Sequence, residues 1–207
     1  MPTSKLRPSF WDHDSCIPLS KDVAPTSIFE RNKHYLVFDL ETQEAIPPGG
    51  GYKEFTQMKV SVACAWDSQV GKMLTFFEKD LNQLIKLMHE RLVIGFNIRG
   101  FDIPVLTGYG LDPEGLDIFD LLDEVKRGTG NYCKLEYLAR GTLNEGKSSD
   151  GLQAVRWFKE GKIKEVAEYC AVDVEITYKV FKHGLDKRYL AIQKPEQARV
   201  EFATDWT

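Results

Sequence analysis

Two acidic residues directly follow a short apolar segment near residue 40, and this junction constrains the fold more than any other feature of the chain. Residues 35–38 are rich in β-forming apolar side chains, which predicts a buried strand. Asp39 and Glu41 follow, two positions apart. Side chains two apart on a strand point to the same side, so both carboxylates are expected to project together from the end of that strand.

Two like charges at this spacing repel each other unless a proton or a cation lies between them. Ligand sets made only of oxygen atoms suit Mg²⁺ or Mn²⁺, so the acidic pair predicts a divalent metal site. The alternative is a strand that simply runs out into a polar loop, because an Asp-x-Glu triplet arises by chance about once per few hundred residues. The later segments of the chain decide between these two interpretations.

Composition narrows the class of protein. The 207 residues suffice for one domain with a full core, and a net charge of −4 gives no global basic field, so nucleic acid would be bound locally and with metal assistance. No stretch reaches transmembrane length, so no membrane partner is expected. The cysteines are scattered, without a C-x-x-C pair or zinc spacing, which favours buried free thiols and a cytoplasmic location.

Hydrophobic periodicity predicts strands early in the chain and helices later. Residues 60–66 and 73–77 are expected to form a hairpin, followed by a fourth strand at 92–96 and a fifth that passes into a helix over 118–125. Helices are expected at residues 81–88, 101–109, 135–140, 151–159 and 163–183, the last ended by Gly184. This order predicts an α/β fold with a mixed sheet and helices on both faces.

The chain divides into three parts by pattern. Residues 1–30 contain four prolines and predict an extended arm, residues 31–185 form the predicted domain, and residues 186–207 form a charged tail with no strong pattern. Within the domain, the Pro- and Gly-rich residues 43–56 predict a flexible loop that begins beside the acidic pair. That loop either covers the site or is an ordinary surface loop.

Two later segments carry further polar residues. Asp102 opens a predicted helix five residues after Asn97, while Tyr169 and Asp173 lie one turn apart on the longest predicted helix and face the same way. Each has an ordinary structural explanation when taken singly. Asp102 would then interact with the dipole of the helix that it opens, and Asn97 would cap a turn. Asp173 would be a partly exposed acid beside a tyrosine at the edge of the core.

Together, the three segments resemble the DEDD family of 3′–5′ exonucleases, which have a ribonuclease H-like fold. That family carries Asp-x-Glu on its first strand, then Asn-x-x-x-Phe-Asp, then either Tyr-x-x-x-Asp or His-x-x-x-x-Asp. The chain has all three motifs in this order, at Asp39/Glu41, Asn97 to Phe101-Asp102, and Tyr169 to Asp173. Residue 168 is Glu rather than His, so the resemblance is to the tyrosine subclass.

The resemblance covers residues 33–183, and residues 95–104 look most like the proofreading domain of family B DNA polymerases. It implies a five-stranded mixed sheet flanked by helices. It also implies two Mg²⁺ or Mn²⁺ ions held by Asp39, Glu41, Asp102 and Asp173, with Asp39 bridging the ions. Tyr169 would then orient or deprotonate the attacking water, and its unperturbed pKa near 10 favours orientation.

Contacts to the substrate are expected on both sides of the acids. Leu40 and Thr42 are placed to meet the terminal nucleotide, and Asn97 and Phe101 to shape a pocket for a splayed 3′ end. A basic interval offers contacts to phosphates, with a solvated helical surface as the alternative for each of its members. These are Lys126, Arg127, Lys134, Arg140, Lys147 and Arg156, of which Lys147 also belongs to the resembling segment.

The resulting prediction is a hydrolase, a metal-dependent 3′–5′ exonuclease acting on single-stranded or frayed DNA in repair or proofreading, with a polymerase or helicase as partner. RNA is the rival substrate, because two-metal chemistry ignores the 2′-hydroxyl unless a side chain clashes with it. The alternative from another class is a non-catalytic nucleic-acid-binding module. Such a module should have lost at least one carboxylate, and none is missing. An internally cutting enzyme is disfavoured by the Tyr-x-x-x-Asp motif.

Overall fold

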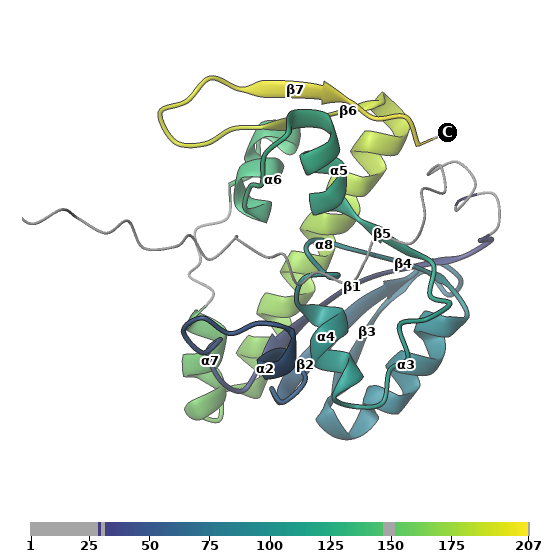
Figure 1. Cartoon of the computed structure of the whole chain (residues 1–207), viewed down its shortest axis with the longest axis vertical. Coiled ribbons are helices and arrows are strands. Elements are labelled where there is room, and N and C mark those ends of the chain that lie inside the picture. Colours follow the sequence, from purple (N-terminus) through teal and green to yellow (C-terminus); the bar gives the residue numbers. More distant parts are fainter. Residues whose placement is uncertain (1–28, 30–31, 147–151, 207) are drawn as a thin grey trace, which may run out of the picture.

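The computed structural model describes residue 29, residues 32–146 and residues 152–206 (Figure 1). Its strands are β1 (Tyr35–Thr42), β2 (Val60–Asp67), β3 (Lys72–Phe77), β4 (Leu92–Gly95), β5 (Ile118–Asp120), β6 (Tyr189–Ile192) and β7 (Val200–Ala203). Its helices are α2 (Tyr52–Phe55), α3 (Leu81–His89), α4 (Asp102–Thr107), α5 (Leu121–Thr129), α6 (Leu135–Leu143), α7 (Leu152–Lys159) and α8 (Ile163–Lys187), with a 3₁₀ turn at Glu78–Asp80. None of the helices described is long and apolar enough to cross a membrane.

The first five strands form one mixed sheet in the order β3-β2-β1-β4-β5. The pairs β1–β2 and β2–β3 are antiparallel, whereas β1–β4 and β4–β5 are parallel. The predicted hairpin, the later strands and the five-stranded mixed sheet are therefore confirmed. The predicted loop over residues 43–56 is wrong at its end, because a one-turn helix, α2, forms there and buries Phe55.

Alternation along β1 divides the core between the two faces of the sheet. Val37 belongs to an apolar cluster with α5, α6 and α8, whereas Leu36 and Phe38 belong to a second cluster with α3 and α4. Successive side chains of a strand point to opposite faces, so a fully apolar strand needs a cover on each side. Helices therefore lie on both faces, as the order of elements predicted (Figure 1).

β1 extends beyond its parallel neighbour. The β1–β4 pairing runs from Tyr35↔Leu92 to Val37↔Ile94, and β4 ends at Gly95. On the other side, β2 stays paired with β1 as far as Thr42. The acidic end of β1 is therefore held by one neighbour only, and the space where β4 has ended is open to side chains from elsewhere.

The end of the chain is more ordered than its sequence pattern indicates. The predicted end of the long helix at Gly184 is wrong, because α8 continues to Lys187, and β6 and β7 then form an antiparallel hairpin. Gly184 instead allows Trp206 to pack closely against α8, since a Cβ added at this position would lie 2.3 Å from the Trp206 ring. Hydrogen bonds of 3.0 Å between Thr142 and the backbone of Ala191 fasten β6 to α6.

Residues 1–28, which make up nearly all of the predicted arm, lie outside the described part of the chain. Phe29 packs its ring against Phe119 at 5.1 Å and Phe181 at 5.8 Å. Cys64, Cys133 and Cys170 are buried free thiols, which confirms that expectation for the cysteines described.

Trp206 provides a test of the C-terminal hairpin. Its side chain is 1% exposed, stacks on Phe181 at 6.0 Å, meets Phe119 edge-on at 4.9 Å and donates from Nε1 to Glu124 Oε2 at 2.6 Å. Trp206→Ala should lower the free energy of unfolding by about 3–5 kcal/mol, because it removes this burial and leaves a cavity.

Urea denaturation with linear extrapolation measures this loss. Val200→Ala on the same hairpin is the control, because Val200 is 51% exposed and its truncation should cost less than about 1 kcal/mol. Equal unfolding midpoints for the two variants would show that burial of Trp206 does not stabilise the domain.

Candidate active site

Three carboxylates meet where α8 lies against the end of β1. Asp39 and Glu41 come from the strand and Asp173 from the helix, and their ligand oxygens all lie within 4.8 Å of one another. All three side chains are half-buried. Adjacent carboxylates at this separation repel one another, and the arrangement is one that a divalent cation with oxygen ligands relieves.

Asp102 approaches the same strand from the other side. Its Oδ1 accepts a hydrogen bond from the Leu40 N–H at 3.2 Å, and the residue is 4% exposed. The Leu40 N–H is available because β4 has already ended at Gly95. Asp102 does not belong to the compact trio of carboxylates, but this bond places it against the backbone between Asp39 and Glu41.

The environment of Asp102 favours its neutral form. Burial raises the pKa of Asp102 well above its usual range, the negative charge of Asp120 acts in the same direction, and the Leu40 N–H opposes both. A proton and a cation therefore compete for this carboxyl group.

Asp120, which sequence reasoning did not assign to the site, anchors the loop that leads to Asp102. Its carboxylate accepts hydrogen bonds from the backbone N–H groups of Asn97 at 2.7 Å, Arg99 at 3.0 Å and Leu122 at 2.9 Å. Asn97 has φ +62°, a strained conformation that this anchoring helps to hold. An Asp just before a helix predicts a cap, but the sequence offers no sign of the two bonds to a distant loop.

Cys170 is a second residue that sequence reasoning did not assign. Its thiol donates to the Asp39 main-chain oxygen at 3.3 Å and lies 3.7 Å from Asp39 Oδ2. Burial raises the pKa of Cys170 well above its usual range, with contributions from the Cys64 thiol and the Asp39 carboxylate. Cys170 therefore stays a neutral donor beside the acids rather than adding a further negative charge.

Tyr169 occupies the same helix as Asp173, one turn earlier. Its half-buried ring meets the Trp157 ring of α7 edge-on, with centroids 6.1 Å apart and an angle of 72° between the planes. Of the predicted site residues on α8, the structure brings Asp173 together with the β1 acids. It also adds α7 as a neighbour that the motif did not indicate.

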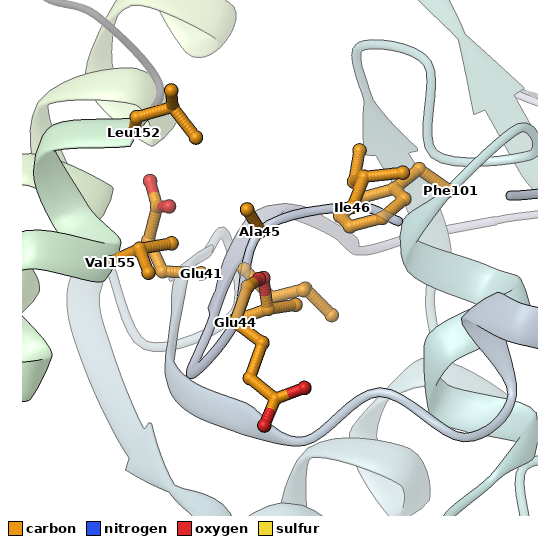
Figure 2. Close-up of a pocket in the computed structure, with 9 residues that line it drawn as sticks. Glu41, Glu44, Ala45, Ile46, Phe101, Leu152 and Val155 are labelled. Carbon is orange, nitrogen blue, oxygen red and sulfur yellow. The ribbon is translucent and has the colours of Figure 1, made fainter. Parts of the chain in front are cut away.

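A cavity of about 310 Å³ opens beside the acids, between α7 and the loop after β1 (Figure 2). Figure 2 shows Leu152 and Val155 on one side, Ile46 and Phe101 on the other, and Ala45 between them. Its lining residues are Leu40, Glu41, Thr42, Glu44, Ala45, Ile46, Phe101, Leu152 and Val155. Glu44, Ala45 and Ile46 belong to the loop that the sequence placed beside the acids, and their position in the lining favours a cover for the site over an ordinary surface loop. The α7 residues of this wall were not predicted, because no motif links α7 to the acids.

The predicted substrate residues fall into three groups. Leu40, Thr42 and Phe101 line the cavity. Asn97 does not line it and instead contributes a backbone N–H to Asp120. Lys147 lies outside the described residues.

Members of the basic interval bond within their own helices. Arg127 forms an ion pair with Glu124, and Arg140 bonds Glu136 at 2.6 Å. Pairs of this kind are common on solvated helices and contribute little to stability. For Arg127 and Arg140, these pairs favour the alternative of a solvated helical surface over contacts to phosphates.

Comparisons with known proteins agree with this geometry. A family model described as 3′–5′ exonuclease matches residues 19–187. Among solved structures, the chain is similar to the family B DNA polymerase from the hyperthermophilic archaeon Pyrobaculum calidifontis, with a TM-score of 0.55 and 16% identity. The similarity covers 73% of this chain and 24% of the polymerase chain, and at this identity it shows the fold. No curated protein matches the chain.

The buried carboxyl group of Asp102 predicts a dependence of stability on pH in metal-free protein. Its pKa is raised in the folded state, so folding retains a proton that the unfolded chain releases, and stability should fall as pH rises from the unfolded to the folded pKa. Asp102→Asn removes this group while keeping an oxygen for the Leu40 N–H. The variant should therefore lose less stability than the parent between about pH 5 and about pH 8.

Urea denaturation in the presence of a chelator, at both pH values, gives the difference between parent and variant. Asp112→Asn is the control, because Asp112 is exposed and its side chain bonds only a turn N–H among the hydrogen bonds described. A difference between parent and Asp102→Asn that is the same at both pH values would contradict the account of Asp102.

Proposed function

The chain belongs to the 3′–5′ exonuclease family, and we propose that it removes nucleotides one at a time from the 3′ ends of single-stranded or frayed DNA. Family membership makes the chain a nuclease that hydrolyses phosphodiester bonds and acts on nucleic acid. The observation that carries the finer proposal is the trio of carboxylates within 4.8 Å, beside a cavity and linked to Asp102 through Leu40. We place this activity in residues 31–185.

The donor set fits the divalent metal on which the family depends. All of its atoms are carboxylate oxygens, the ligands that Mg²⁺ and Mn²⁺ prefer. We propose that Asp39, Glu41, Asp102 and Asp173 hold two such ions, with Asp39 shared between them. When bound, the ions supply an activated water and neutralise charge on the phosphate and on the leaving 3′ oxygen.

The protein's own residues prepare this site. The Cys170 thiol restricts the orientation of Asp39 through its contacts to the main-chain oxygen and Oδ2. Because burial raises the pKa of Asp102, a proton would compete with a cation for its carboxyl group, so occupancy of the site should increase with pH. The Tyr169 hydroxyl, one turn from Asp173, orients the attacking water.

The cavity supports a splayed terminal nucleotide as substrate. Its volume of about 310 Å³ is at the small end of the range for ligand pockets, which favours one unpaired nucleotide over an intact base pair. Phe101 is supported from behind by Phe55, edge-on at 5.2 Å, and offers a surface for stacking worth about 1–3 kcal/mol per base. Glu41 and Glu44 would repel a phosphate, so binding there needs the cations.

DNA rather than RNA is proposed because the fold resembles part of a DNA polymerase. The same similarity supports the proposal that the chain works with a polymerase or a helicase in repair or proofreading. RNA is the alternative substrate, and comparison of matched DNA and RNA strands decides between them.

Asp39 gives the most direct test of the nuclease proposal. Oligonucleotides of DNA and RNA, labelled at the 5′ end, should be shortened in single-nucleotide steps with Mg²⁺ or Mn²⁺, and single-stranded DNA should be shortened fastest. Asp39→Asn and Asp173→Asn should abolish this activity, because each removes a charge that holds the cations. Melting temperature in chelator should not fall, since the same change relieves repulsion.

Asp186→Asn is the matched control on α8. Its carboxylate is exposed and pairs with Lys182 at 3.1 Å, far along the helix from Asp173. This variant should retain parental activity. Cleavage by Asp39→Asn at the parental rate, or products from internal cuts, would overturn the assignment.

Tyr169 is expected to contribute to rate and not to metal affinity. Tyr169→Phe keeps the ring and removes only the hydroxyl, so the cleavage rate should fall by about 10²–10⁴-fold, the usual range for such a group. Its dependence on Mn²⁺ concentration should remain that of the parent, because a neutral phenol does not compete with carboxylates for a hard cation. Full activity, or rescue by added metal, would place Tyr169 outside the reaction.

A further inference from the structure

Trp157 lies behind the proposed site and has no role in the motifs of the family. It is half-buried on α7, and it is not among the residues that line the cavity. Its ring meets Tyr169 edge-on, at 6.1 Å between centroids and 72° between planes. We propose that Trp157 is a positioning residue that holds the Tyr169 phenol in its working orientation. This inference rests on the proposed function.

The turn between α7 and α8 fixes where Trp157 lies. The Lys162 N–H donates to the Trp157 carbonyl at 2.8 Å and the Gly161 N–H to the Phe158 carbonyl at 2.9 Å. Gly161 has φ +75°, and the two bonds form a Schellman turn that ends α7. α8 begins at Ile163, so α7 folds back along α8 through a very short connection.

This geometry places the indole opposite the second turn of α8. Tyr169 lies six residues into that helix, about 9 Å along its axis, and Trp157 is two residues before the end of α7. The α8 backbone is fixed by buried residues on either side of Tyr169, such as Val166, Cys170 and Val174. The torsion of the tyrosine ring is still adjustable, and the contact with the indole restricts it.

An edge-on aromatic contact suits this purpose. Aromatic pairs prefer such an arrangement because the positive ring edge of one meets the negative face of the other, so the pair resists rotation of either ring. Small displacements of a group that acts on a bound water carry large penalties in rate. Loss of the indole should therefore lower the rate through Tyr169 and leave substrate affinity unchanged.

A double-mutant cycle separates this role from simple support of the fold. In full-length protein with Mn²⁺ and single-stranded DNA, Trp157→Leu should lower kcat about tenfold with KM within about twofold. Trp157→Phe keeps an aromatic ring and should recover most of that loss. In the Tyr169→Phe background, Trp157→Leu should change kcat by less than about twofold, because the hydroxyl that it positions is already absent.

Trp66→Leu is the matched control. Trp66 also meets a tyrosine of α8, Tyr178, at 5.4 Å, nine residues and about 13 Å along the helix from Tyr169. Trp66→Leu removes a tryptophan–tyrosine contact away from Tyr169, so it should leave kcat within about twofold of the parent.

A second measurement is independent of activity. The protein labelled with 3-fluorotyrosine and kept free of metal should give a ¹⁹F resonance for Tyr169, identified by its loss in Tyr169→Phe. Trp157→Leu should move this resonance, whereas Trp66→Leu should leave it in place and move that of Tyr178.

Three results would overturn the inference. They are an equal loss of kcat from Trp157→Leu with and without the Tyr169 hydroxyl, a rise in KM with kcat unchanged, and an unmoved Tyr169 resonance. The second would make Trp157 a contact for the nucleic acid. A parent protein without nuclease activity would overturn the proposed function itself, whereas these results in an active parent overturn only the role of Trp157.

Discussion

The unequal lengths of two neighbouring strands are the constraint on which the candidate site depends. β1 runs to Thr42, while its parallel partner β4 stops at Gly95, so the last residues of β1 have a sheet neighbour on one side only. Because β4 has ended, the Leu40 N–H has no strand partner on that side, and it donates a hydrogen bond to Asp102 instead. Asp39 and Glu41 continue the alternation of Val37 and so face α8. Acids from three distant parts of the chain thereby meet at one place.

The site carries a cost that the rest of the domain offsets. Three carboxylates within 4.8 Å and a buried fourth disfavour the metal-free fold, since each adds repulsion or desolvation. Against this, both faces of the sheet are covered by helices, so β1 is buried on both sides directly before its acidic end. Trp206, which follows the C-terminal hairpin, adds further burial. The apolar layers thus stabilise the fold, whereas the acids destabilise it in the absence of metal.

Local patterns predicted the sheet and the acids, because alternation, helical spacing and the three motifs are short-range signals. They did not predict features that depend on distant contacts. Gly184 signals a helix end, yet α8 continues to Lys187, and the glycine instead makes room for the distant Trp206 ring. Asp120 signals a helix cap, and its bonds to the loop at Asn97 appear only once β4 and β5 are paired. The α7 wall of the cavity follows from the turn at Gly161, which no motif marks.

The central claim is that the acids at the end of β1 hold two divalent cations, and titration of the metal-free protein with Mn²⁺, followed by electron paramagnetic resonance, tests it most directly. The account predicts saturation at two ions per chain. It also predicts that Asp39→Asn loses this binding while keeping the fold, since Asp39 is the proposed shared ligand. Asp186→Asn should bind as the parent does. An absence of saturable binding at millimolar Mn²⁺, or equal binding by Asp39→Asn and the parent, would contradict the account.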